Sequence, residues 1–164
     1  MKMRFLCDMH RFELDSRPER ATNCWQNSYD TGLLLYEQQM WSEALPHFGC
    51  AFESSEILLS NRVLKPQLGY DLFTSSALLL VDTFKALNYI NQSREVCSLA
   101  MNRLEHELRK APNAIHLIKQ HLNKLYPAMQ SLEEQPFSTI NTDTKLATSR
   151  TKTAAVITLN TGNG

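Results

Sequence analysis

The side chains that could coordinate a metal ion are scattered along the chain. Cys7 and His10, in the stretch "CDMH", place a thiol three positions from an imidazole. A zinc site needs about four ligands, and no second pair with this spacing follows. His116 and His121 are five positions apart, which puts them on different faces of a helix. The sequence therefore predicts neither a metal site nor a cofactor.

Nucleophilic catalysis would need a cysteine held beside a histidine and a site for the oxyanion. Four cysteines and five histidines allow many pairings, and the sequence singles out none of them. Glu133 and Glu134 are typical of a solvated helix end. Two of the five glycines lie at the extreme C-terminus, and none belongs to a phosphate-binding loop. We expect a protein that is not an enzyme, with a small enzyme as the third alternative.

The charge pattern is that of an ordinary mixed surface. The formal net charge is zero and the isoelectric point is about 7.0, whereas nucleic-acid-binding domains usually carry a basic stripe. Nucleic-acid binding would rest on five basic residues that are interleaved with Glu105, Glu107 and histidines: Arg103, Arg109, Lys110, Lys119 and Lys124. A helical regulator that contacts nucleic acid is the second alternative, and a cluster of Lys and Arg on one face would favour it.

The sequence indicates a soluble, cytoplasmic protein. Asp8 and His10 interrupt the N-terminal stretch before it reaches the length of a signal peptide. The longest apolar run elsewhere, 77–81, is far shorter than the roughly 18 to 20 residues of a membrane span. The cysteines at 7, 24, 50 and 97 are not closely spaced, so we expect reduced and mostly buried thiols.

Apolar residues recur at helical intervals and predict an all-α fold of about five helices. The first helix should begin at Asp15 or Ser16, because either residue can cap it and Pro18 suits the first turn. Ser93 should cap the fourth helix. The expected helices cover about 15–38, 41–61, 67–90, 94–110 and 115–132, with Pro127 as a kink or an early stop.

Three regions follow from this reading. Residues 1–14 form an N-terminal segment, and residues 15–135 form one helical domain. Residues 136–164 are rich in Thr, Asn and Gly and predict a flexible, disordered tail, because they lack the apolar groups that would offset the entropy of ordering. Within that tail, "AAVITL" at 154–159 has strand propensity and could dock in a groove.

Small and large residues alternate in the first two expected helices. Gly32, Ala44 and Ala51 are small, and Tyr36 and Phe48 lie beside them. A glycine in the middle of a helix costs about 1 kcal/mol relative to alanine, so a packing reason is expected. The pattern predicts two antiparallel helices at close range.

The same positions resemble the tetratricopeptide repeat family. That family has a small residue in its first helix and the order alanine, aromatic, alanine in its second. Gly32, Ala44, Phe48 and Ala51 fall at the matching offsets, and the match covers about residues 25–58.

Three departures from the family pattern are clear. The early tryptophan of the family would fall at Ser28, whereas this chain has Trp25. The family's first-helix tyrosine would fall at Leu35, whereas this chain has Tyr36. A second repeat aligned through Val96 would be about 52 residues away, not the roughly 34 of the family. The chain therefore shows one good repeat, one divergent helical hairpin and a last helix.

The resemblance implies that the first helices line a concave surface that binds an extended peptide or a helix of a partner. By offset from Gly32, the groove-facing residues would be Gln26, Tyr29, Asp30, Leu33, Tyr36 and Glu37. In the alternative reading, the two tyrosines and the leucine belong to the core. Family members that clamp a terminal carboxylate use Lys and Asn where this chain has Tyr29 and Leu33, so that use is not supported.

The function that we expect is therefore non-catalytic. It is an adaptor, chaperone-like or regulatory module that binds another protein in an apolar and aromatic groove. The close approach of the first two helices should tolerate no added bulk at Ala44 or Ala51. Glu53, by contrast, should lie on the outer face of the second helix.

Overall fold

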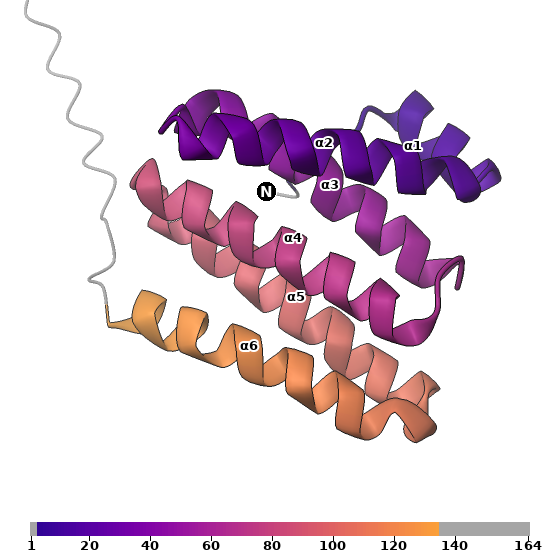
Figure 1. The fold of residues 1–164 in the computed structure, drawn as a ribbon. Helices are drawn as coiled ribbons and strands as arrows, with labels where there is room; N and C mark the ends of the chain where they lie inside the picture. The colour runs from indigo at the N-terminus through magenta and orange to yellow at the C-terminus, as the bar shows by residue number, and fades with distance from the viewer. Residues whose placement is uncertain (1–2, 135–164) are drawn as a thin grey trace, which may run out of the picture.

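The computed structural model describes residues 3–134, which form six α-helices and one 3-10 turn (Figure 1). The helices are α1 (Asp8–Ser16), α2 (Glu19–Glu37), α3 (Trp41–Ser60), α4 (Pro66–Ala86), α5 (Ile90–Lys110) and α6 (Ile115–Glu133), with the turn η1 at Pro112–Ala114. The expectation of an all-α chain is confirmed for this range. The tail predicted at 136–164 lies outside the described residues.

Each long helix packs against the next one along the chain. The pairs α2 and α3, α3 and α4, α4 and α5, and α5 and α6 are all in contact. In Figure 1, α4 and α6 also lie side by side, with α5 packed behind them. The short α1 contacts both α2 and α3. No helix within residues 3–134 combines the length and apolar character needed to cross a membrane.

Three tight turns make consecutive helices antiparallel. Each turn has one residue in the left-handed region, with φ of 60° at Gln39, 54° at Arg62 and 60° at Asn88. The next amide reaches back five residues to a carbonyl oxygen, as in the 2.8 Å bond from the Tyr89 N–H to Phe84. This pattern satisfies carbonyl groups at the helix end and stops the helix.

The predicted start of the first helix was wrong. Residues 8–16 form α1, and the chain bends at Arg17 and Pro18 before α2 begins. The residue that precedes a proline disfavours helical backbone, which explains why Arg17 has a φ of −136°. Leu14 is buried in a cluster with Trp25, so tertiary contacts stabilise a helix whose own apolar pattern is weak.

The predicted cap of the fourth helix was also wrong. α5 begins at Ile90, and Ser93 lies buried within it. The Ser93 Oγ donates a 2.7 Å hydrogen bond to the carbonyl oxygen of Val81 in α4. The side chain therefore joins two helices instead of capping one.

The close approach of α2 and α3 is confirmed. A Cβ at Gly32 would lie 2.8 Å from two ring atoms of Phe48, which is too close for any side chain. Ala44, Phe48 and Ala51 have no exposed surface. The small residues therefore let the two helices meet around one aromatic ring.

Candidate functional site

The residues predicted to line a groove on α2 divide into two kinds. Three are exposed and polar, and three are half-buried and apolar or aromatic: Gln26, Asp30 and Glu37, then Tyr29, Leu33 and Tyr36. The Nε2 of Gln26 donates to both carboxylate oxygens of Asp30, at 2.9 and 2.8 Å. None of the six lines either of the two cavities described below.

The two tyrosines pack partly between the helices. The Tyr29 ring stacks on Trp25, with centroids 4.7 Å apart, and meets Phe48 edge-on at 6.3 Å. Tyr36 meets Trp41 at 4.6 Å and Phe48 at 5.9 Å. These rings therefore contribute to the contact of α2 with α3, and a groove on this face stays a prediction.

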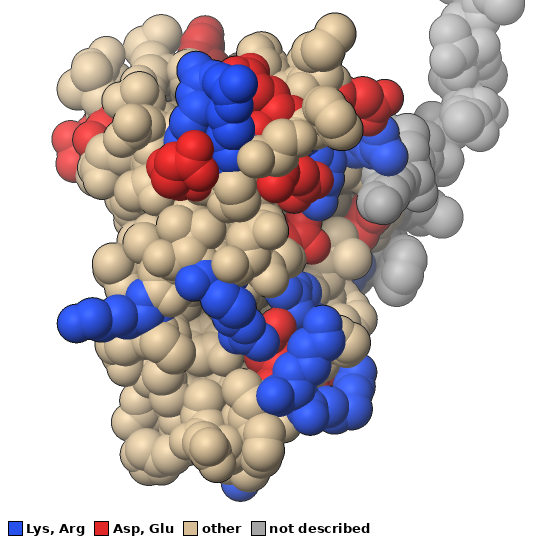
Figure 2. Space-filling view, turned by 90° about the vertical axis from the view of Figure 1, so that its right-hand side faces the viewer, with Lys and Arg blue, Asp and Glu red and all other residues tan. Residues whose placement is uncertain are grey.

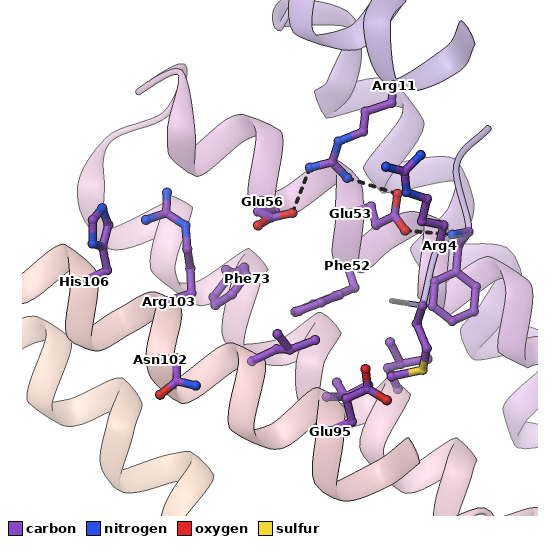
Figure 3. A pocket seen from close by; sticks show the side chains of 15 residues that line it. Arg4, Arg11, Phe52, Glu53, Glu56, Phe73, Glu95, Asn102, Arg103 and His106 are labelled. Carbon is purple, nitrogen blue, oxygen red and sulfur yellow. Dashed lines mark hydrogen bonds and ion pairs between the residues drawn. The ribbon is translucent and has the colours of Figure 1, made fainter. Parts of the chain in front are cut away.

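A large cleft opens elsewhere, where α3 and α5 both pack on α4 beneath the N-terminal segment (Figure 3). Its volume is about 660 Å³, which is in the range of ligand-binding clefts. Its apolar lining comes from the N-terminal segment and three helices: Met3 and Phe5, Phe52 of α3, Phe73 and Leu80 of α4, and Val96 and Leu99 of α5. Leu99 is 48% exposed, an apolar side chain at the edge of the cleft with no cover.

The N-terminal segment forms one wall of the cleft through a buried carboxylate. Glu53 is only 5% exposed. It accepts hydrogen bonds from the backbone N–H groups of Phe5, at 2.7 Å, and Leu6, at 3.3 Å. Arg11 lies 3.2 Å from the Glu53 carboxylate and 3.1 Å from that of Glu56 (Figure 3). The carboxylate therefore ties the extended segment and α1 to α3.

This geometry corrects the expectation for Glu53, which was predicted on the outer face of α3. The prediction was wrong because the N-terminal segment covers that face. Gly49 lies one helical turn before Glu53, and a Cβ there would meet the Phe5 ring at 2.0 Å. The absence of a side chain at Gly49 thus leaves the space that Phe5 fills.

A second cavity of about 520 Å³ adjoins the cleft at the C-terminal part of α5. Arg103 and His106 line both cavities. In the second one, Glu107 is 1% exposed and pairs with Arg62 at 2.7 Å and with Arg103 at 2.6 Å. Lys110 also lines it, so three cations and one carboxylate are among the described residues that line this cavity.

The charged surface reflects this arrangement. Figure 2 shows several Lys and Arg side chains close together in the lower half of the face, with a few acidic atoms among them, and a mixture of acidic and basic side chains above. Burial, and then the positive charges of Lys110, Arg109 and Arg103, lower the pKa of His106. These cations add to the effect of burial, because a positive neighbour disfavours the protonated imidazole.

The described residues offer little for catalysis. The Cys7 Sγ lies 3.4 Å from the His10 Nδ1, but both side chains are exposed and neither lines a cavity. Burial raises the pKa of Cys50 and of Cys97 to about 11, so both are protonated thiols with weak nucleophilicity. No group of three potential metal ligands occurs within residues 3–134.

The expectation of mostly buried thiols was partly wrong. All four cysteines are free; Cys97 is buried, Cys24 and Cys50 are half-buried, and Cys7 is exposed.

A scan against protein-family models finds no family that matches the chain, and searches of curated proteins and of solved structures find no significant match. The function is therefore argued from the geometry of the site.

Sequence reasoning missed this cleft. Its lining comes from the N-terminal segment and from three consecutive helices, and the N-terminal residues lie about 50 to 100 positions before the residues that they meet there. One local signal was present: Glu53 directly follows Ala51 and Phe52, which lie on the apolar face expected for this helix. A carboxylate at such a position calls for a partner from elsewhere in the chain.

Proposed function

We propose that this protein is a non-catalytic protein-binding module of the cytoplasm, with an adaptor, chaperone-like or regulatory role. The observation that carries the proposal is the cleft between α3 and α5, which has an apolar floor and charged residues at its rim. Protein-binding surfaces commonly combine an apolar centre with a polar rim. The ligand would be a peptide segment or a helix of the partner.

A tetratricopeptide-like array is part of this proposal. In it, α2 with α3 and α4 with α5 are successive hairpins, and α6 packs against the last one. The antiparallel contacts between consecutive helices support the arrangement. The proposed binding mode departs from the family's, because the cleft lies against the second helix of each hairpin, whereas the family uses the first.

The rigid support of the cleft favours binding over a packing defect. Phe52 stacks on Phe73, with ring centroids 5.2 Å apart, and Phe73 and Leu80 are almost fully buried. The floor is thus held by the core, while Leu99 at the edge remains exposed. A preformed apolar site lowers the entropic cost of binding.

The test compares two leucines with equal exposure. Leu99, in the cleft, and Leu68, on α4 outside both cavities, are each 48% exposed. The full-length protein and its Leu99→Glu and Leu68→Glu variants would each be used for affinity capture from a lysate of cells that carry the gene, followed by mass spectrometry. We expect a partner that the wild type and Leu68→Glu retain and that Leu99→Glu loses. Equal capture by all three proteins would refute the cleft as the binding site.

A second candidate function is contact with nucleic acid. The observation in its favour is the gathering of Lys and Arg at one end of the molecule (Figure 2). Comparing the binding of acidic peptides with that of oligonucleotides separates the two candidates.

A further inference from the structure

The basic end beside the cleft carries more positive charge than its carboxylate neutralises. Arg62, Arg103 and Lys110 line the second cavity, and Glu107 is the one carboxylate among its described lining residues. Both arginines pair with that carboxylate. No ion pair of Lys110 is found within residues 3–134.

The arginine at the junction of the two cavities is held in place. The Arg103 side chain is 16% exposed. It donates from Nη1 to Glu107 at 2.6 Å and from Nη2 to the Ser60 Oγ at 3.1 Å. Glu107 in turn accepts a 3.4 Å hydrogen bond from the Tyr70 hydroxyl. A guanidinium has five N–H donors, so these bonds fix its position and leave donors for a ligand.

The apolar and basic parts lie along one face of α5. Leu99, Arg103, His106 and Lys110 follow at intervals of four, three and four residues, the spacing of one helix face. From Leu99 to Lys110 the helix rises about 16 Å. An extended peptide spans that length with about five residues.

We propose that the partner segment is acidic at one end: an apolar side chain enters the cleft beside Leu99, and an Asp or Glu about two to five residues away meets Arg103 and Lys110. This inference rests on the proposed function, since it specifies the ligand of the same cleft. The carboxylate partner follows from charge complementarity with the three cations. A terminal carboxylate would supply the same chemistry as a side chain.

A peptide fits this site better than a nucleic acid does. Nucleic-acid affinity depends on many phosphate contacts along a basic stripe. Here only three cations, Arg62, Arg103 and Lys110, are found among the described residues that line the second cavity, and an apolar cleft adjoins them.

The experiment is a selection from a random peptide display library on the full-length protein. The Lys110→Glu variant is compared with Lys119→Glu, a matched charge reversal on an exposed residue of α6 outside both cavities. We expect the wild type and Lys119→Glu to enrich peptides with an apolar residue and a nearby Asp or Glu. Lys110→Glu should lose that acidic preference.

Synthetic versions of the enriched peptides then give affinities by fluorescence anisotropy. Lys110→Glu should weaken binding about two- to fivefold, as expected for a solvent-exposed ion pair, and added salt should weaken binding to the wild type. Replacing the Asp or Glu by its amide should have a similar effect. Amidation of the C-terminus distinguishes a terminal carboxylate from a side chain.

Other outcomes would refute the acidic end of the ligand, or the cleft as a binding site as well. Enriched peptides without acidic residues, lost on Leu99→Glu, would refute the acidic end and leave the cleft function standing. If no peptide is enriched and no captured partner depends on Leu99, the proposed function fails as well. Binding of a single-stranded or duplex oligonucleotide that Lys110→Glu weakens, with no binding of acidic peptides, would assign the basic end to nucleic acid.

Discussion

The two sides of α3 differ in how closely they pack against neighbouring helices. Toward α2, Ala44 and Ala51 are small and fully buried, and Phe48 fills the space opposite Gly32. Toward α5, Phe52 faces a cleft of about 660 Å³. Small side chains bring the first pair of helices into close contact, whereas α3 and α5 are held apart because both pack on α4.

This difference between the two sides of α3 shows how one fold can supply both stability and a binding surface. The α2–α3 contact excludes open space, so substitutions there should cost stability. The α3–α5 side keeps an opening that core residues support from below, so changes at its edge should affect binding and leave the fold intact. Substitutions on the two sides of α3 test this division.

The largest effect should come from Phe48. The Phe48→Ala variant removes a ring with no exposed surface and should lower the free energy of unfolding by about 3–5 kcal/mol. Phe52→Ala, on the cleft side, should cost less, because that ring is half-buried. Urea unfolding followed by circular dichroism measures both. Equal losses would contradict the contrast between the two sides.

The next effect tests close packing directly. Changing Ala44 or Ala51 to Leu should overpack the α2–α3 contact and cost about 1–3 kcal/mol. Glu43→Leu, at an exposed position of the same helix, is the control and should change stability by less than about 0.5 kcal/mol. If all three variants melt alike, the helices do not meet at these alanines.

Glu53 sharpens the comparison on the cleft side. Glu53→Ala removes the acceptor of the Phe5 and Leu6 amides and should cost about 1–3 kcal/mol, because buried donors are left unsatisfied. Hydrogen exchange at those two amides should become faster. Glu56→Ala is the matched control, since Glu56 is more exposed and, within residues 3–134, its side chain bonds to Arg11 alone. Unchanged exchange in Glu53→Ala would mean that the segment is held by other contacts.

The smallest effect is a pH dependence from His121, which is buried against Tyr70. Burial, and then the positive charge of Lys124, lower the pKa of His121 despite the carboxylate of Asp71. The unfolded chain therefore takes up a proton more readily than the folded one. Stability should be at its full value above about pH 6.5 and fall as the pH drops toward the lower pKa of the folded state.

Two variants isolate this histidine. His121→Gln should abolish that part of the pH dependence in a thermal unfolding series. His106→Gln, at the rim of the cleft, should leave it nearly unchanged, because that imidazole is more exposed. A pH dependence that persists in His121→Gln would assign it to another group.

Much of the helical pattern was predictable from the sequence because local periodicity carries it. α3 and α6 begin and end close to the expected residues. The errors lie where a distant contact decides: α1 forms because Leu14 finds an apolar cluster, and Ser93 bonds to Val81 of another helix. The candidate site was not predictable, since its residues come from four separate segments.

The amino-acid sequence was enough to predict that the chain is helical and that α2 and α3 lie close together. Both follow from short-range rules, namely the spacing of apolar residues and the small size of Gly32, Ala44 and Ala51. The position of the cleft follows from tertiary packing, because it depends on how far apart α3 and α5 are held. Tertiary packing also decided the place of Glu53, since a carboxylate becomes buried only when distant donors, here the Phe5 and Leu6 amides and Arg11, reach it.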